Sequence, residues 1–203
     1  MNYLIAHHTY QYPFLHTTAR KKTIKHKLIS VLSGFATVRL GKQEYVINAG
    51  DAFWLPLDCL TALTYFPNCT FIEVEVSVRS SKNYPHHAGL VQPSSLLNAL
   101  LEKLSDSPFT PNNHEQKKWL DVVDFELEKL SPLLDESVMT LDQADKCSNI
   151  DKTSLQMALK VRQAFKLRSS GIKAERIIDE IFSANAQQAE QLCLAIANQT
   201  LNR

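Results

Sequence analysis

Carboxylates at close spacing are the residues in this chain whose types most directly suggest chemistry. Glu73 and Glu75 stand two residues apart in the run FIEVEVSV, so in a strand both side chains lie on one face, where paired carboxylates can bind a metal or transfer protons. Their alternation with Ile72, Val74 and Val76 is also the pattern of an outer strand with one face in solvent. We therefore expect both carboxylates to be solvent-exposed and assign them no chemistry.

The histidine pairs His7-His8 and His86-His87 do not predict a ligand set. Adjacent side chains of an extended chain point to opposite faces, so we expect both pairs to be solvated. The sequence contains no Cys-x-x-Cys pair, no Ser-His-Asp or Cys-His arrangement and, with 5 Gly in the chain, no glycine-rich phosphate loop. These features predict a protein that is not an enzyme and carries no cofactor.

Three short apolar runs between residues 26 and 56 are the elements that would position a site. They are separated at Gly34, Gly41 and Gly50, which is the pattern of short strands joined by tight turns. Gly50 tolerates a positive φ and the side chain of Asp51 can bond back to the backbone, so the chain can reverse there. We predict consecutive strands of a small β-barrel. Two further strands are predicted at residues 63 to 66 and 70 to 78.

Two motifs in this stretch resemble the sensory cupin domain of AraC/XylS-type transcription regulators. They are Leu-Ser-Gly at residues 32 to 34 and Asn-Ala-Gly-Asp-Ala-Phe-Trp-Leu-Pro at residues 48 to 56, and the resemblance covers residues 24 to 78. It implies an α+β chain in which an N-terminal cupin-like β-barrel is followed by an all-helical region. The domains expected from it are an effector-binding cupin at 1 to 90, a helix pair for dimerisation at 91 to 132 and a helical region at 133 to 203.

The resemblance does not extend to the metal site of metal-dependent cupins. Those cupins supply two histidines and a glutamate before the first glycine and another histidine after the proline of the second motif. In this sequence only His26 stands in such a place, while Leu28 follows it and the run Cys59-Leu60-Thr61 comes after Pro56. A single histidine forms no chelate, so we expect no bound metal.

A small-molecule effector is expected instead at the mouth of the barrel, because cupin-like folds bind small ligands there among a few polar groups. Aromatic rings would line this site, and His26 and Arg39 would supply its polar groups. The predicted effector-binding residues are His26, Phe35, Arg39, Tyr45, Trp54 and Tyr65.

Residues 1 to 27 leave two questions open. The aromatic and histidine-rich segment 1 to 23 either packs on the barrel as a first pair of strands, which we favour, or closes over the effector as an arm. The lysines at 21, 22, 25 and 27 either form a solvated strand edge, the commoner arrangement, or bind an anionic effector or phosphate.

Two amphipathic helices are predicted after residue 93. Leucines recur at helical spacing from residue 94 to 104, and a wide apolar stripe at 114 to 130 includes Trp119, Leu120, Val123 and Leu127. Such a pair resembles the helices that join subunits in the AraC/XylS family, so a homodimer through residues 94 to 130 is expected. The alternative is that the helices only cover an open edge of the barrel.

Residues 140 to 160 resemble the first helix-turn-helix of the same family. Asp151 would cap its recognition helix, whereas Asp145 departs from the motif because a small apolar residue is usual there. The second motif of the family is barely recognisable after residue 171. The resemblance therefore implies weak contact with one major groove of DNA. The predicted DNA-binding residues are Lys152, Thr153, Gln156, Lys160 and Arg162.

The composition is that of an ordinary soluble protein. Its 203 residues are 44% hydrophobic, and 22 Lys plus Arg against 21 Asp plus Glu give a formal net charge of +1, without the basic excess typical of nucleic-acid binding. Four separated cysteines and the absence of a long apolar run lead us to expect a cytoplasmic protein that does not enter a membrane. Two functions remain: an effector-sensing transcription regulator with reduced DNA binding, or a cupin sensor that lost DNA binding and acts through a protein partner.

Overall fold

A computed structural model describes residues 3–110, 113–135, 138–146 and 152–201, with the side chains of 144–146 outside the description. The strands are β1 (Ile5–Tyr12), β2 (His16–Thr17), β3 (Lys21–Lys22), β4 (His26–Ser33), β5 (Phe35–Leu40), β6 (Gln43–Asn48), β7 (Ala52–Leu55), β8 (Leu60–Tyr65), β9 (Cys69–Val76) and β10 (Gly89–Val91). The helices are α1 (Ser95–Ser105), α2 (His114–Leu127), the 3-10 helix η1 (Leu141–Lys146), α3 (Lys152–Ser169), α4 (Ala174–Phe182) and α5 (Ala186–Ala197). In the described residues, no helix combines the length and apolar character needed to cross a membrane. The chain is α+β, as the sequence predicts.

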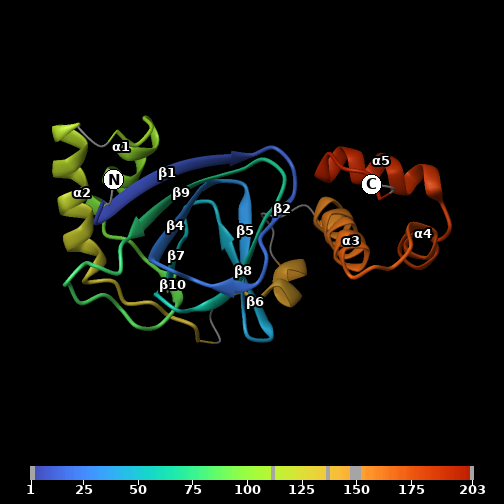
Figure 1. The fold of residues 1–203 in the computed structure, drawn as a ribbon, viewed down its shortest axis with the longest axis horizontal. Coiled ribbons are helices and arrows are strands. Elements are labelled where there is room, and N and C mark those ends of the chain that lie inside the picture. The colour runs from blue at the N-terminus through green and yellow to red at the C-terminus, as the bar shows by residue number, and fades with distance from the viewer. Residues whose placement is uncertain (1–2, 111–112, 136–137, 147–151, 202–203) are drawn as a thin grey trace.

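The strands form two antiparallel sheets that face each other (Figure 1). The first sheet has the order β1-β9-β4-β7-β10, and the second has the order β2-β8-β5-β6 with β3 also paired to β8. The predicted barrel is therefore a pair of sheets and, over the described residues, not one closed ring of hydrogen bonds. Some strands that follow one another in the sequence belong to different sheets. In the first sheet β4 pairs with β7 and β9, whereas β5 and β6 form a hairpin in the second. The apolar core between the sheets includes Ile29, Val31, Phe53, Leu55, Phe71, Val38, Ile47, Leu63 and Tyr65.

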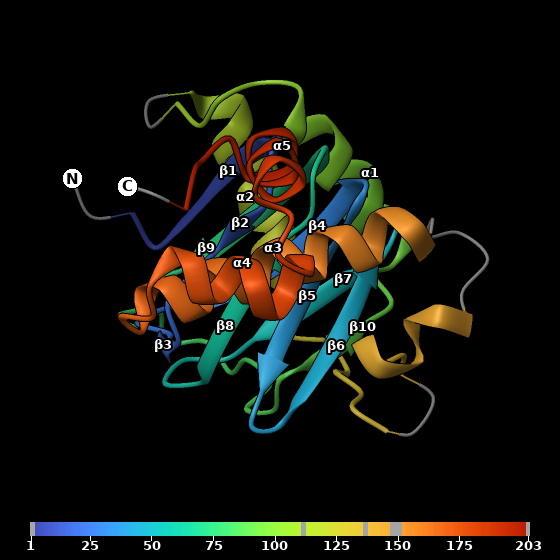
Figure 2. The same ribbon diagram turned by 90° about the vertical axis from the view of Figure 1, so that its right-hand side faces the viewer.

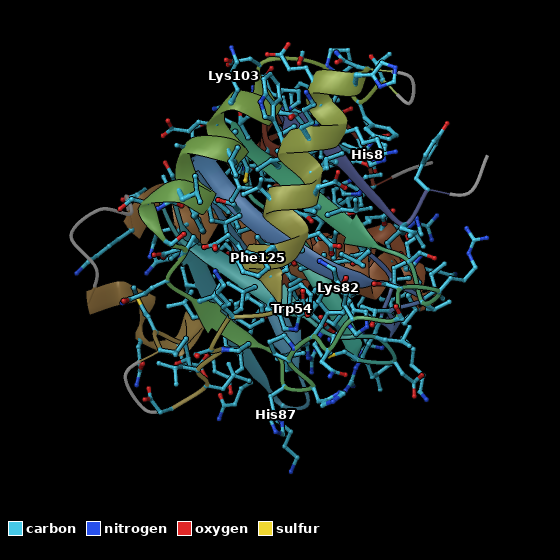
Figure 3. All side chains as sticks on the ribbon, turned by 90° about the vertical axis from the view of Figure 1, so that its left-hand side faces the viewer. His8, Trp54, Lys82, His87, Lys103 and Phe125 are labelled. Carbon is cyan, nitrogen blue, oxygen red and sulfur yellow. The ribbon has the colours of Figure 1, made fainter. Side chains whose placement is uncertain are left out.

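Helices α1 and α2 cover the outer face of the first sheet (Figures 1 and 3). Ser94 caps α1 by accepting a hydrogen bond from the Leu97 backbone at 3.1 Å, which satisfies one of the free N–H groups at the start of the helix. Their buried side chains are Leu97, Leu101, Leu104, Leu120, Val123 and Leu127, packed on Leu28, Trp54, Ile72, Val74 and Val76. The leucine-rich faces of the two helices are thus used within the chain, to cover a sheet.

Helices α3, α4 and α5 lie on the opposite side of the molecule, and α3 crosses the outer face of the second sheet (Figure 2). They share a core of their own that includes Val161, Ala164, Ile177 and Cys193. Attachments to the rest of the chain include an apolar cluster and a backbone hydrogen bond. Leu155 and Ala158 of α3 pack in one buried cluster with Val46 and Phe66, and the Leu15 backbone donates a 2.7 Å hydrogen bond to the Ile196 carbonyl.

The chain between α2 and α3 forms a strap, residues 128–135 and 138–146, that pairs with an edge of each sheet. Leu133 exchanges backbone hydrogen bonds of 2.8 and 2.9 Å with Leu90 of β10, and the Met139 carbonyl accepts one of 2.9 Å from Val46 of β6. Gly89 is needed for this crossing because a Cβ atom there would lie 2.6 Å from the Leu133 carbonyl oxygen. The strap thus occupies backbone groups at both sheet edges.

Candidate functional site

The six predicted effector-binding residues do not share one cavity. Trp54 and His26 lie on the side of the helix pair, with ring centroids 5.6 Å apart and the Tyr84 ring 5.1 Å from His26. Trp54 is fully buried and its indole nitrogen donates to the Pro85 carbonyl at 2.9 Å. The pKa of His26 is lowered by burial and, secondarily, by His86, which keeps the imidazole neutral at pH 7.

Three other predicted effector residues are aromatic rings in apolar packing. Tyr65 lies between the sheets with its ring 4.1 Å from Phe71, and burial, aided by Glu73, raises its pKa well above the ordinary value. Tyr45 borders the same core from β6, whereas Phe35 stacks on Phe66 at 4.2 Å beneath α3. The sixth residue, Arg39, lies at an open cavity.

That cavity is a groove of about 660 Å³ between the second sheet and the helical region, here called the junction groove. Its walls come from β5, β6, β8 and the segment after β1 on one side, and from α3 and the end of α5 on the other. The lining combines hydroxyl, cationic and apolar side chains. They include Leu15, Thr17, Thr18, Arg39, Glu44, Thr64, Arg162, Phe165, Lys166, Ser169 and Ala197.

Positive charge exceeds negative charge in the junction groove. Arg39, Arg162 and Lys166 line it, whereas Glu44 is the carboxylate in its lining. Glu44 pairs with Arg162 and stands opposite Arg39 in the β5–β6 register. The Nε atom of Arg39 is buried and has no hydrogen-bond partner among the described residues. An anion in the groove would meet the excess of positive charge.

A charged cluster between the sheets corrects the expectation for Glu73 and Glu75. Glu73 is 6% exposed, and Lys27 contacts Glu73 at 2.8 Å and Glu75 at 2.9 Å, with Lys25 also paired to Glu75. The expectation of solvent exposure was wrong because β9 is an inner strand of the first sheet. Since the helix pair covers its Val74 face, the opposite face, which carries both glutamates, points into the space between the sheets.

The pKa values in this cluster indicate paired charges. Burial would raise the pKa of Glu75, but hydrogen bonds from Lys25 and Lys27 lower it to about 2. Burial raises the pKa of Glu73, and Lys27 offsets only part of that effect. Burial would lower the pKa of Lys27, but Glu73 and Glu75 raise it, so the ammonium stays charged. The lysines that are close together in the sequence therefore have different partners. Lys25 and Lys27 pair with the glutamates between the sheets, whereas Lys22 pairs with Asp58 at the surface.

Histidine 7 also differs from its expected solvated position. Its side chain is fully buried beside Phe109, with ring centroids 5.6 Å apart, and neither ring nitrogen has a hydrogen-bond partner among the residues that the structure describes. Burial, aided by His8, lowers its pKa to about 4.

No group of three or more potential metal ligands occurs among the described residues. The prediction that the protein binds no metal is a separate matter for elemental analysis.

All five predicted DNA-binding residues are on α3, but the helix presents them in two directions. Lys152, Thr153, Gln156 and Lys160 are exposed. Arg162 turns toward the second sheet and pairs with Glu44. The proposed capping role of Asp151 and the unusual side chain of Asp145 lie outside the described residues.

Helices α4 and α5 form a second helix pair with a tight turn, but its charge does not suit phosphate. The turn includes Ser183 and Ala184, both with positive φ, and Asn185 caps α5 through the Gln188 backbone at 3.0 Å. The exposed side chains of the two helices include four acids and one arginine: Glu175, Asp179, Glu180, Glu190 and Arg176. Contact with nucleic acid would therefore depend on α3.

Comparison with solved structures gives fold-level similarities at low sequence identity. Apo ToxT K231A from Vibrio cholerae has a TM-score of 0.46 and 10% identity, over 98% of this chain and 96% of that chain. ToxT with bound unsaturated fatty acid has a TM-score of 0.44 and 11% identity, over 98% and 94%. A cupin superfamily protein from Desulfitobacterium hafniense has a TM-score of 0.35 and 10% identity, over 38% and 71%. No family model and no curated protein matches the chain.

Proposed function

We propose that this chain is a cytoplasmic, non-enzymatic sensor of a small-molecule effector that regulates transcription, with the junction groove as its effector site. The observation that carries the proposal is that the groove has one wall from the second sheet and one from the helical region. A ligand that touches both walls binds most tightly when α3 is docked on the sheet. By linkage it shifts the protein toward that state, which is how occupancy could control the helices.

The lining favours a small anionic ligand with an apolar part. Arg39 supplies a guanidinium group and Lys166 an exposed ammonium group, while Leu15, Phe165 and Ala197 supply apolar surface. Fatty acid, the ligand named for one ToxT structure, has this combination of a carboxylate and an apolar chain. A medium-chain carboxylate is therefore a suitable first probe.

Binding of decanoate, acetate and inorganic phosphate to the full chain tests the effector site. We expect decanoate to raise the thermal midpoint in a concentration-dependent way, and acetate and phosphate to do so far less. Arg39→Gln should weaken decanoate binding about tenfold, the effect expected from loss of a charged hydrogen bond. Arg79→Gln, the same substitution at an exposed position after β9, is the matched control. If decanoate does not bind, or binds equally to both variants, the proposed site is wrong.

Weak DNA binding through α3 is the second part of the proposal. The exposed face of α3 carries Lys152, Gln156 and Lys160, which suits a few phosphate and base contacts. Affinity near the non-specific range, about 10⁻⁴ to 10⁻⁶ M at physiological salt, is expected. Fluorescence anisotropy against random and promoter-derived duplexes measures it. Nanomolar sequence-specific binding that is lost in the variant Gln156→Ala with Lys160→Ala would contradict the proposal, because it would show that α3 binds DNA more tightly and more specifically than expected.

The alternative, a sensor that has lost DNA binding and acts through a protein partner, is favoured by the acidic exposed face of α4 and α5. Complete absence of binding to duplex DNA at low salt would support it.

We also propose a homodimer through residues 94 to 130. Because Leu97 and Leu101 are buried in the chain's own core, the contact would use the exposed residues Leu96, Val122 and Phe125. Phe125 is labelled on the helix pair in Figure 3.

A further inference from the structure

Among the predicted DNA-binding residues, Arg162 is the one that pairs with a carboxylate within the described part of the chain. Its two terminal nitrogens bond to the two carboxylate oxygens of Glu44, with Nη2 3.2 Å from Oε2, and Nη1 also donates to Thr64 Oγ1 at 3.2 Å. The two side chains are 24% and 17% exposed. A guanidinium binds a phosphate through this same two-point geometry, so Glu44 and a phosphate cannot occupy Arg162 together.

We infer that Glu44 is an internal competitor of nucleic-acid phosphate for Arg162, which makes the contact between β6 and α3 an autoinhibitory clasp. Contacts within the second sheet position the Glu44 side chain. The Thr37 hydroxyl donates to its carboxylate, and the β5–β6 register places it beside Arg39. The acceptor is therefore fixed before α3 docks, which lowers the cost of forming the pair.

The position of Arg162 on α3 explains what release would add. Exposed polar residues follow one face of the helix at spacings of three and four, ending at Lys166 one turn beyond Arg162. Those residues are Lys152, Gln156, Lys160, Gln163 and Lys166. Once released from Glu44, Arg162 would extend this basic stripe along its edge. Docking also buries Leu155 and Ala158 against the sheet, so the clasp limits how closely a duplex can approach that side of α3.

The clasp operates without any ligand and so goes beyond the proposed effector site. It predicts that a substitution in the sensor sheet, on a residue that touches no DNA in either state, raises affinity for DNA. An ordinary structural ion pair would not have this effect, since its loss would lower stability and leave DNA affinity unchanged.

The test compares Glu44→Gln with Glu180→Gln in the full chain. Both substitutions remove one negative charge and one arginine partner, but the Arg176–Glu180 pair is exposed on α4, with side chains 72% and 47% exposed. Anisotropy with a random duplex at several salt concentrations should show about two- to fivefold tighter binding for Glu44→Gln, the range expected from competition by one partly exposed ion pair. The salt dependence should steepen by about 0.9 in log–log slope, for one added phosphate contact.

Arg162 provides the internal check. Adding Arg162→Gln to Glu44→Gln should remove the whole gain, because the gain is assigned to Arg162 meeting phosphate. Hydrogen exchange should also become faster at residues 155 to 162 in Glu44→Gln. If that variant does not unfold cooperatively, Thr64→Val, which removes the neutral acceptor of Arg162, should show the same trend with a smaller gain.

Three results would overturn the inference. They are equal DNA affinity in Glu44→Gln and Glu180→Gln, a gain that persists without Arg162, and no DNA binding by any form of the protein. Failure of decanoate to bind would count against the effector site and leave the clasp standing, because the clasp is measured without ligand.

Discussion

Replacing Lys27 by Met should reveal how much the charged cluster between the sheets depends on its central cation. Lys27 bonds to both Glu73 and Glu75, and its side chain is 23% exposed. Met keeps the length of the side chain but leaves the Glu73 carboxylate, 9% exposed, without its ammonium partner. Breaking a buried pair in this way costs about 3 to 5 kcal/mol, and the lower end applies because Glu75 retains Lys25.

The pKa of Glu75 reflects the same interaction from the side of the carboxylate. Its value of about 2 lies below the ordinary 4.5 because Lys25 and Lys27 donate hydrogen bonds to the carboxylate. Because the pKa is lowered on folding, ionised Glu75 stabilises the protein above pH 4.5, and this contribution is lost as the pH falls from 4.5 to about 2. Without Lys27, protonation of the carboxylates relieves the cost of burying them. The free-energy penalty of Lys27→Met should therefore be about 3 kcal/mol at pH 7 and clearly smaller at pH 4.

Urea unfolding at pH 7 and pH 4 measures this difference. Lys22→Met is the matched control, since Lys22 pairs with Asp58 at the surface, where both side chains are more than 60% exposed, and we expect an effect below about 1 kcal/mol. A penalty for Lys27→Met that equals the control, or that is the same at both pH values, would refute the reasoning.

Three further predictions concern the strap, the dimer and the metal content. Gly89→Ala should lower the free energy of unfolding by about 1 to 3 kcal/mol in urea titrations, because its Cβ would collide with the Leu133 carbonyl; an unchanged midpoint would contradict this. Phe125→Lys should convert the proposed dimer to a folded monomer in light scattering, whereas Leu97→Lys should unfold the chain, since Leu97 is 1% exposed. Elemental analysis should find no stoichiometric transition metal; about one metal per chain, lost on His26→Ala, would reverse that prediction.

Local patterns predicted the elements well. Gly50, with φ of +90°, lies in the predicted reversal, where Asp51 accepts a 2.9 Å hydrogen bond from the Asn48 backbone. The helix predicted from residue 94 is α1, capped by Ser94 as its sequence suggests. These features depend on neighbours within a few residues, which is the information that a single sequence carries.

Features that depend on which face is covered were harder to predict. The alternation around Glu73 correctly separated the two faces of β9, but only the packing of α1 and α2 on the Val74 face shows that the glutamates point inward. Glu44 was missed although a signal existed. Arg39 and Glu44 are equally far along the chain from the turn at Gly41 and Lys42, so a tight hairpin places them opposite each other. That Arg162 would meet Glu44, 118 residues earlier in the chain, has no local signal.

The strap has a practical consequence for dividing the protein into fragments. A sensor fragment that stops at residue 132 would retain every strand, yet it would lose Leu133 from the edge of β10 and Met139 from the edge of β6. Uncovered edge strands are templates for association between chains, so such a fragment is expected to aggregate. A fragment that ends after η1, at residue 146, keeps the edges of β10 and β6 paired and is the shortest fragment expected to remain dispersed in solution.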